Sequence, residues 1–88
     1  MDIDVWFFGR FRELATRQQI VTLDSGARLG DLIEWLIKEY GIEFSEEIKK
    51  TKGYAIMRNK RYCDVSTHRN TPLKDGDVVA FMPIVAGG

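Results

Sequence analysis

The sequence predicts an α+β domain, with a mixed sheet of four to five strands packed on one main helix. Several short segments are rich in β-branched and aromatic residues, which is typical of strands. Between residues 29 and 40, in contrast, apolar residues recur at three- and four-residue spacing, which is typical of a helix. The chain has 88 residues and is 44% hydrophobic, so we expect one compact domain.

The first part of the chain contains two predicted strands with a short helical turn between them. Residues 3–8 predict the first strand, residues 11–15 the turn and residues 20–23 the second strand. Side chains alternate between the two faces of a strand. In the first strand, one face carries Ile3, Val5 and Phe7, and the other carries Asp4, Trp6 and Phe8.

The main helix is predicted from Leu29 to Tyr40, and Gly41 suits the left-handed position that often follows a helix end. Its expected buried stripe is Leu29, Leu32, Ile33, Leu36 and Tyr40. Arg28 is a poor N-cap, so we expect Asp24 or Ser25 to contribute at the start. The charged segment 43–53 predicts a solvated loop with a turn of helix near residues 45–49.

The second part of the chain predicts three more strands. Residues 54–58 and 62–65 flank a tight turn at Asn59-Lys60, and residues 78–82 follow a turn at 71–77. The last strand is apolar on both faces, as expected at the centre of a sheet. This order of elements allows the first and last strands to lie parallel and adjacent. That is the ubiquitin-like β-grasp arrangement, which leaves one sheet face free for a partner.

Charge and cysteine content exclude several classes of function. Thirteen acidic and thirteen basic residues cancel, so neither nucleic acid nor a membrane is an expected partner. Cys63 is the single cysteine and no signal-peptide-type leader precedes the first strand, so we expect a cytoplasmic protein. Cys63 is expected to be a small buried apolar side chain, and together with the single histidine, His68, it cannot build a metal site.

The end of the sequence is its most informative segment. We expect residues 1–83 to form the β-grasp domain and residues 84–88 a flexible tail ending in Gly87-Gly88. Glycines can pass through a channel too narrow for a Cβ, and they leave the terminal carboxyl unhindered. A carboxylate is a poor electrophile, so chemistry there needs ATP to form an acyl-adenylate, from which a sulfur or amine nucleophile displaces AMP.

Three segments, in this order, resemble the MoaD family of sulfur carriers. They are residues 7–15 (Phe-Phe-Gly-Arg-Phe-Arg-Glu-Leu-Ala), residues 73–83 (Leu-Lys-Asp-Gly-Asp-Val-Val-Ala-Phe-Met-Pro) and the Gly-Gly end. The resemblance covers nearly the whole chain. It implies that a ubiquitin-activating-type (MoeB/ThiF-like) enzyme adenylates Gly88 with ATP and that Gly88 becomes a thiocarboxylate. The sulfur is then delivered inside the molybdopterin synthase large subunit (MoaE-like).

The resemblance also implies roles for individual residues, with the carrier itself a co-substrate that binds no cofactor. Gly88 would be the reactive residue and Gly87 the flexible approach to it. The rest of the inserted tail would be Ile84, Val85 and Ala86. The apolar contacts to both partners would come from Phe8, Tyr62 and Met82, with Trp6 as a fourth member and Arg12 as a basic contact to the activating enzyme.

Two other functions remain open. Archaeal small modifier proteins also resemble this family, and in them the activated glycine is attacked by a lysine of a target protein. Self-conjugation would use the basic run of Lys49, Lys50 and Lys52. A third reading is a non-covalent β-grasp binding module in which the Gly-Gly end is incidental.

Overall fold

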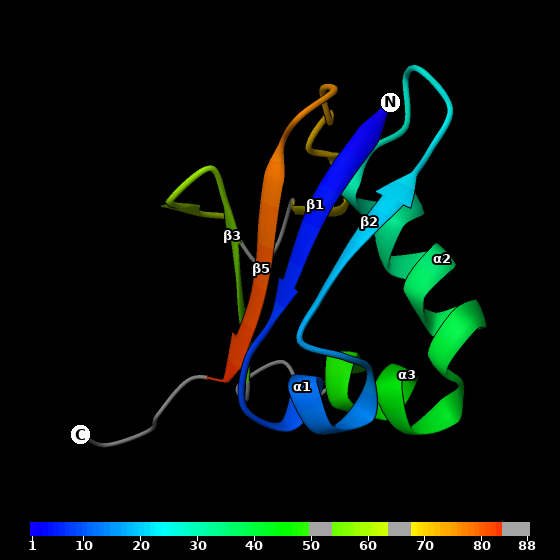
Figure 1. Cartoon of the computed structure of the whole chain (residues 1–88), viewed down its shortest axis with the longest axis vertical. Helices are drawn as coiled ribbons and strands as arrows, with labels where there is room; N and C mark the ends of the chain where they lie inside the picture. The colour runs from blue at the N-terminus through cyan, green and yellow to red at the C-terminus, as the bar shows by residue number, and fades with distance from the viewer. Residues whose placement is uncertain (50–53, 64–67, 84–88) are drawn as a thin grey trace.

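The structure is a computed structural model that describes residues 1–49, 54–63 and 68–83. The elements in chain order are β1 (Asp2–Phe7), α1 (Arg10–Leu14), β2 (Gln18–Thr22), α2 (Leu29–Tyr40), α3 (Ile42–Lys49), β3 (Tyr54–Arg58), β4 (Arg61–Tyr62), a 3₁₀ turn η1 (His68–Asn70) and β5 (Val78–Pro83). Figure 1 shows α2 along one side of the sheet and α1 and α3 together at one end. The predicted tail, residues 84–88, and Lys50 and Lys52 lie outside the described residues.

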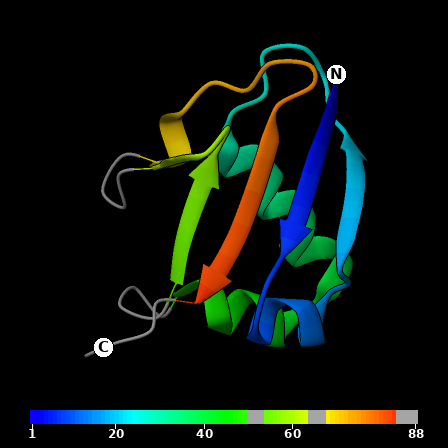
Figure 2. The same ribbon diagram turned by 60° about the vertical axis from the view of Figure 1, so that its left-hand side comes forward.

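The five strands form one mixed sheet in the order β2-β1-β5-β3-β4. β1 and β5 pair in parallel, and the other neighbours pair antiparallel. Figure 2 shows this order across the sheet, with α2 crossing behind it. The predicted ubiquitin-like β-grasp fold, with the first and last strands adjacent at the centre, is therefore confirmed. Among the described residues, no helix is both long and apolar enough to cross a bilayer.

Four phenylalanines hold the two short helices to the centre of the sheet. Phe7 and Phe81 come from the two central strands and stack at a centroid distance of 5.8 Å. Phe11 of α1 and Phe44 of α3 are 5.6 Å apart, and each also lies within 6.2 Å of the Phe81 ring. All four side chains are fully buried. Aromatic pairs at these separations stabilise the fold beyond the burial of their surface.

The predicted face of α2 is buried against the sheet. Its fully buried side chains are Leu29, Leu32, Ile33 and Leu36, and Tyr40 is half-buried. Gly41 has a φ of 90° and its N–H donates to the Ile37 carbonyl over 2.8 Å, so the predicted glycine end of the helix is confirmed.

The start of α2 differs from the prediction. The backbone N–H of Arg28 donates to the carboxylate of Asp31 over 2.8 Å. The expected contribution of Asp24 or Ser25 is wrong, because an acid at the third helical position reaches back to the residue before the helix, as in one half of a capping box.

The predicted loop at residues 43–53 is wrong in its described part, since Ile42–Lys49 forms the helix α3. Phe44 and Ile48, four residues apart, are buried, and the exposed positions between and beside them include Glu43, Glu46 and Lys49. Two apolar positions among many charges give a weak periodic signal. The helix forms because Phe44 joins the aromatic cluster, which the local sequence does not reveal.

The strand boundaries also differ slightly from their predictions. β1 covers residues 2–7 where 3–8 was expected, and β2 covers 18–22 where 20–23 was expected. β4 covers residues 61–62, and the predicted residues 64 and 65 lie outside the described part of the chain. Strand ends depend on backbone pairing with a neighbour, which side-chain patterns do not encode.

We expect the aromatic cluster to dominate stability. Phe81→Ala would remove the ring that touches Phe7, Phe11 and Phe44, and should lower the free energy of unfolding by about 3–5 kcal/mol. Ile42→Ala, at a side chain that is 75% exposed, should change it by less than about 0.5 kcal/mol. Urea unfolding followed by circular dichroism measures both. Equal losses would show that the cluster is not the centre of the core.

Candidate functional site

The sheet face turned away from α2, here called the open face, carries a row of apolar residues. Trp6 of β1 pairs with Ala80 of β5, and Ala80 pairs in turn with Met57 of β3. Tyr62 of β4 is the partner of Met57 and continues the row. Paired residues on neighbouring strands project to the same face of a sheet. Four strands therefore place apolar side chains in one row across the open face.

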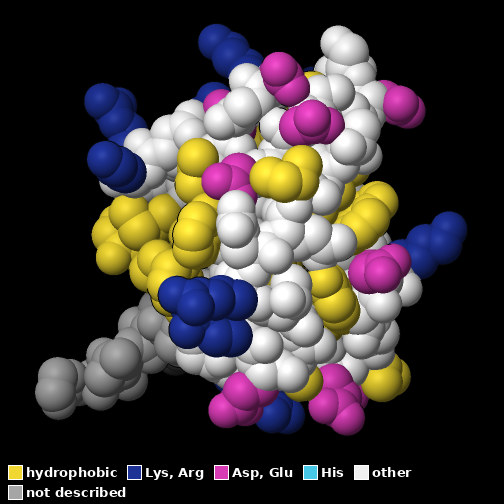
Figure 3. Space-filling model, viewed as in Figure 1, with side chains coloured by type: hydrophobic (Ala, Val, Ile, Leu, Met, Phe, Trp, Pro, Cys, Tyr) yellow, Lys and Arg dark blue, Asp and Glu magenta, His cyan; other side chains and the backbone are white. Residues whose placement is uncertain are grey.

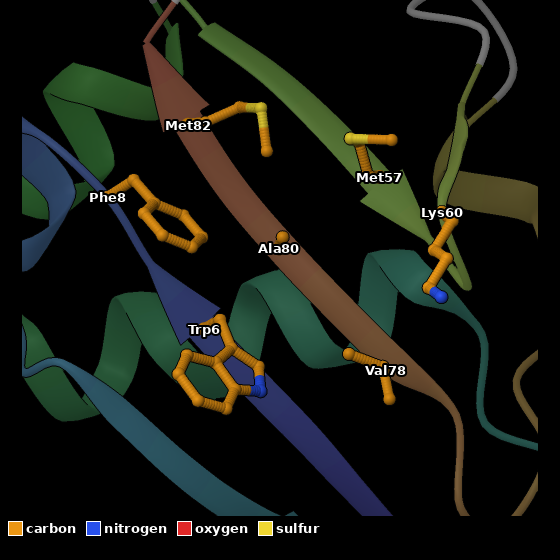
Figure 4. Close-up of a pocket in the computed structure, with 7 residues that line it drawn as sticks. All are labelled: Trp6, Phe8, Met57, Lys60, Val78, Ala80 and Met82. Carbon is orange, nitrogen blue, oxygen red and sulfur yellow. The ribbon is translucent and has the colours of Figure 1, made fainter.

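These side chains form a groove of about 270 Å³. Its lining consists of Trp6, Phe8, Met57, Lys60, Val78, Ala80 and Met82. Figure 4 shows the Trp6 and Phe8 rings on one side of β5 and Met57 and Lys60 on the other. Ala80 lies between them and forms the floor, because its methyl group is the smallest of these side chains. The groove exists because the central strand carries a small residue between large ones.

Part of this groove is predicted by the sequence. Phe8 and Met82 line it as predicted, and so does Trp6. Tyr62 does not line it, although it lies on the same face and is 71% exposed. The prediction that Phe8, Tyr62 and Met82 share a face agrees with the structure, but Tyr62 stands one strand beyond the groove.

Four of the lining residues were not predicted from the sequence. They are Met57, Lys60, Val78 and Ala80. The alternation of β5 was a usable signal, because residues 78 and 80 share the parity of Met82. Met57 and Lys60 could not be found in this way, since their positions depend on how β3 pairs with β5 and on the turn that follows β3.

Arg12, the predicted basic contact, lies against one wall of the groove. Its guanidinium carbon is 5.2 Å from the centroid of the Phe8 ring, and its Nε donates to the Phe7 carbonyl over 3.0 Å. A cation over an aromatic face contributes about 0.5–1 kcal/mol at exposed sites. Arg12 therefore places a positive charge beside Phe8. Figure 3 shows Lys and Arg side chains above and below the hydrophobic side chains on the left of the view, where β5 and β3 lie.

The turn after β3 closes the opposite end of the groove. Asn59 and Lys60 have φ angles of 51° and 70°, the left-handed pair that a tight two-residue hairpin turn requires. The Asn59 N–H donates to the Val78 carbonyl over 2.8 Å, and the Val78 N–H donates to Asn59 Oδ1 over 2.9 Å. Backbone and side chain of Asn59 thus fasten the turn to the first residue of β5.

The side chain of Asp77 also holds this turn in place. Its carboxylate accepts hydrogen bonds from Arg58 Nε (2.9 Å), Asn59 Nδ2 (2.9 Å) and the Lys74 backbone N–H (2.8 Å). The residue is only 6% exposed. Burial raises the pKa of Asp77, but these hydrogen bonds and the charge of Arg58 outweigh it, so the pKa lies below its ordinary value.

In the described part of the chain, the remaining polar side chains that could be reactive or bind a metal lie apart from one another. Cys63 is half-buried and packs against the core, and burial raises the pKa of its thiol. This agrees with its predicted role as an apolar side chain. Across residues 1–49, 54–63 and 68–83, no three His, Cys, Asp or Glu side chains gather where a metal ion could bind.

Residues 5–88 match the ThiS family. The chain belongs to the ThiS family. Over its full length it is 34% identical to the molybdopterin synthase sulfur carrier subunit of Chlamydomonas reinhardtii, which it also covers completely. It is 32% identical to small archaeal modifier protein 3 of Haloferax volcanii, again over 100% of both chains.

A solved structure is also similar to this ThiS-family protein over nearly its whole length. The putative molybdopterin converting factor subunit 1 of Pyrococcus furiosus is 37% identical, with a TM-score of 0.79, over 97% of this chain and 99% of that one. The resemblance to MoaD sulfur carriers seen in the sequence is therefore confirmed.

The Asp77 network leads to a pH prediction. A carboxyl whose pKa is lower in the folded state stabilises the fold above its unfolded pKa, and this contribution is lost as pH falls through the folded value. Stability should therefore fall as pH drops below the ordinary value of 3.8. Asp77→Asn should lose about 1–3 kcal/mol at neutral pH and should show a weaker acid dependence.

Urea unfolding at a series of pH values between about 2 and 7 measures this dependence. Asp24→Asn is the control, because Asp24 is exposed and, among residues 1–49, 54–63 and 68–83, its side chain makes no hydrogen bond or ion pair. If wild type and Asp77→Asn lose stability in parallel as pH falls, other carboxyls are responsible for the acid dependence.

Proposed function

We propose that this ThiS-family protein is a sulfur carrier for molybdopterin (molybdenum cofactor) biosynthesis and that Gly88 carries the sulfur. The observation behind the proposal is that β5 connects the groove to the C-terminal segment that ends at Gly88. Met82 lines the groove near the end of β5, and the segment from Ile84 to Gly88 follows that strand directly in sequence. The full-length similarity to a sulfur carrier subunit supports the same function.

The proposed reaction has two steps at the terminal carboxyl. The carboxylate of Gly88 attacks the α-phosphorus of ATP on a MoeB/ThiF-like activating enzyme, which releases pyrophosphate and leaves an acyl-adenylate. Hydrosulfide then adds to the acyl carbon and AMP departs, so a thiocarboxylate forms with no change in oxidation state at sulfur or carbon. A MoaE-like large subunit would receive the tail, and water would restore the carboxylate after sulfur transfer. The protein acts as a co-substrate rather than as an enzyme.

The groove contributes to this reaction through binding. Phe8, Met82 and Trp6 are half-buried, so a partner that covers them would remove further apolar surface from water. Each square ångström of apolar surface so covered is favourable by about 25 cal/mol. Docking there would bring the tail, with Gly87 and the residues from Ile84 to Ala86, into the partner's active site. The reaction of Gly88 then becomes effectively unimolecular.

A second candidate function is supported by the similarity to small archaeal modifier protein 3. In that case the same acyl-adenylate would be attacked by a lysine amine of a target protein, an isopeptide bond would form and AMP would leave. The groove and the activating enzyme would serve both reactions. A purely non-covalent binding module would use the groove but would give Gly88 no role.

Intact mass spectrometry distinguishes these functions. With the cognate activating enzyme, ATP and hydrosulfide, we expect the wild-type mass to rise by the difference between one sulfur and one oxygen atom. Deletion of Gly87-Gly88 should abolish this change and leave the circular dichroism spectrum unaltered. Conjugates of higher mass that survive reducing denaturation would instead support the modifier function. If the deletion variant gained the same mass, the terminus would not be the reactive site.

Binding and chemistry should separate between groove and tail variants. Phe8→Asp, which charges the wall, and Ala80→Leu, which fills the floor, should each weaken binding to the activating enzyme by about 1–3 kcal/mol. Gly88→Ala should bind normally but lose most ATP–pyrophosphate exchange, because one methyl group disturbs the attack geometry.

Ile42→Asp is the matched control for Phe8→Asp. Ile42 is an exposed apolar residue at the start of α3, outside the groove. Calorimetric titration gives the affinity of each variant, and exchange of labelled pyrophosphate gives the chemistry. A loss of affinity in Ile42→Asp as large as that in Phe8→Asp would contradict the assignment of the groove as the docking surface.

A further inference from the structure

We infer that the surface of the activating enzyme that docks in the groove carries a carboxylate that pairs with Lys60, at the end of the groove opposite Met82. The inference rests on the proposed function, since it specifies the chemistry of the partner surface. Lys60 follows Asn59, which is hydrogen-bonded to Val78 at the start of β5. Because Val78 and Met82 are four residues apart on β5, the carboxylate is expected about 13 Å along the strand from the Met82 contact.

Among the described residues that line the groove, Lys60 is the one that carries a charge. In Figure 4 its side chain lies beside β5, with the amino group at the end of the groove opposite Phe8 and Met82. The remaining lining residues are all apolar. A lysine can bury its methylene chain along such a surface and keep its charge at the rim.

The backbone of Lys60 is held in place before any partner binds. Its left-handed conformation is shared with Asn59, and Asn59 is fixed by hydrogen bonds to Val78 and to the buried carboxylate of Asp77. A preorganised backbone lowers the entropic cost of binding through this residue. The side chain alone remains to be ordered.

Within the described part of the chain, the ammonium of Lys60 makes no hydrogen bond or ion pair. The nearby carboxylate of Asp77 already accepts three hydrogen bonds, and Asp4 of the open face accepts one from Gln18. A partner that covered both the groove and the Lys60 ammonium with apolar groups alone would strip water from an unpaired cation, which is strongly unfavourable. A carboxylate on the partner removes that penalty.

Arg12 provides a second cation at the other end, where it lies over the Phe8 ring. The groove therefore has a positive charge at each end and apolar side chains between them. The complementary surface is an apolar segment with an acidic residue at each end. The acid opposite Lys60 is the one inferred from the structure.

The test uses the full chain and its cognate ubiquitin-activating-type enzyme, with dissociation constants measured by calorimetry at low and high salt. Lys60→Glu should weaken binding about 30-fold and Lys60→Gln about 5-fold, with a smaller salt dependence for Lys60→Gln than for wild type. Lys60→Arg should bind within about twofold of wild type, since it keeps the charge. The matched control is Lys38→Glu, an exposed charge reversal on α2, behind the sheet.

Two results would overturn the inference, and they have different consequences for the proposed function. If Lys60→Glu and Lys38→Glu bind alike while Phe8→Asp binds weakly, the groove is the docking surface but Lys60 extends into solvent. If Phe8→Asp also binds like wild type, the docking surface itself is wrong. Should Lys60→Glu fail to fold in urea unfolding curves, Lys60→Gln and its salt dependence decide the matter.

Discussion

The parallel pairing of β1 with β5 is the constraint on which both faces of this protein depend. Its register sets Phe7 beside Phe81 on the helix side and Trp6 beside Ala80 on the open side. A slip of one residue would exchange the two faces of β5. The aromatic core and the apolar groove are therefore two results of one register, and neither can change its pairing without the other.

The two ends of β5 are held by different kinds of interaction. Near its end, Phe81 packs among the aromatic rings of β1, α1 and α3. Just before its start, the buried carboxylate of Asp77 collects hydrogen bonds from Arg58, Asn59 and Lys74. Aromatic packing allows a range of ring orientations, whereas a hydrogen bond restricts both the distance and the angle between its two groups. The start of β5, which is held by hydrogen bonds, lies beside the turn that carries Lys60. The end of β5, which is held by aromatic packing, precedes residues 84–88 in the sequence.

The sequence allowed the fold to be predicted because its signals were strong and local. The periodic stripe of α2, the Asn59-Lys60 turn and the apolar last strand each required only their own residues. The helix α3 and the residues Met57 and Lys60 of the groove could not be predicted in this way. The helix that contains Phe44 forms because the Phe44 ring packs against rings from distant parts of the chain, such as Phe7. Lys60 lies in the groove because β3 pairs with β5. Both depend on contacts that exist only in the folded chain.

A shallow groove with a one-methyl floor can be occupied by one protein at a time. Under the proposed function, an activating enzyme and a sulfur-accepting subunit would both dock on it and would therefore have to bind in turn. The carrier would have to leave the first before it could bind the second. With association rate constants of about 10⁵–10⁷ M⁻¹s⁻¹, a Kd near 1 μM corresponds to departure at roughly 0.1–10 s⁻¹. Very tight docking would therefore slow the whole cycle. A small apolar contact with a charge at its rim suits such a carrier, because the carrier must dissociate from one partner as readily as it binds the next.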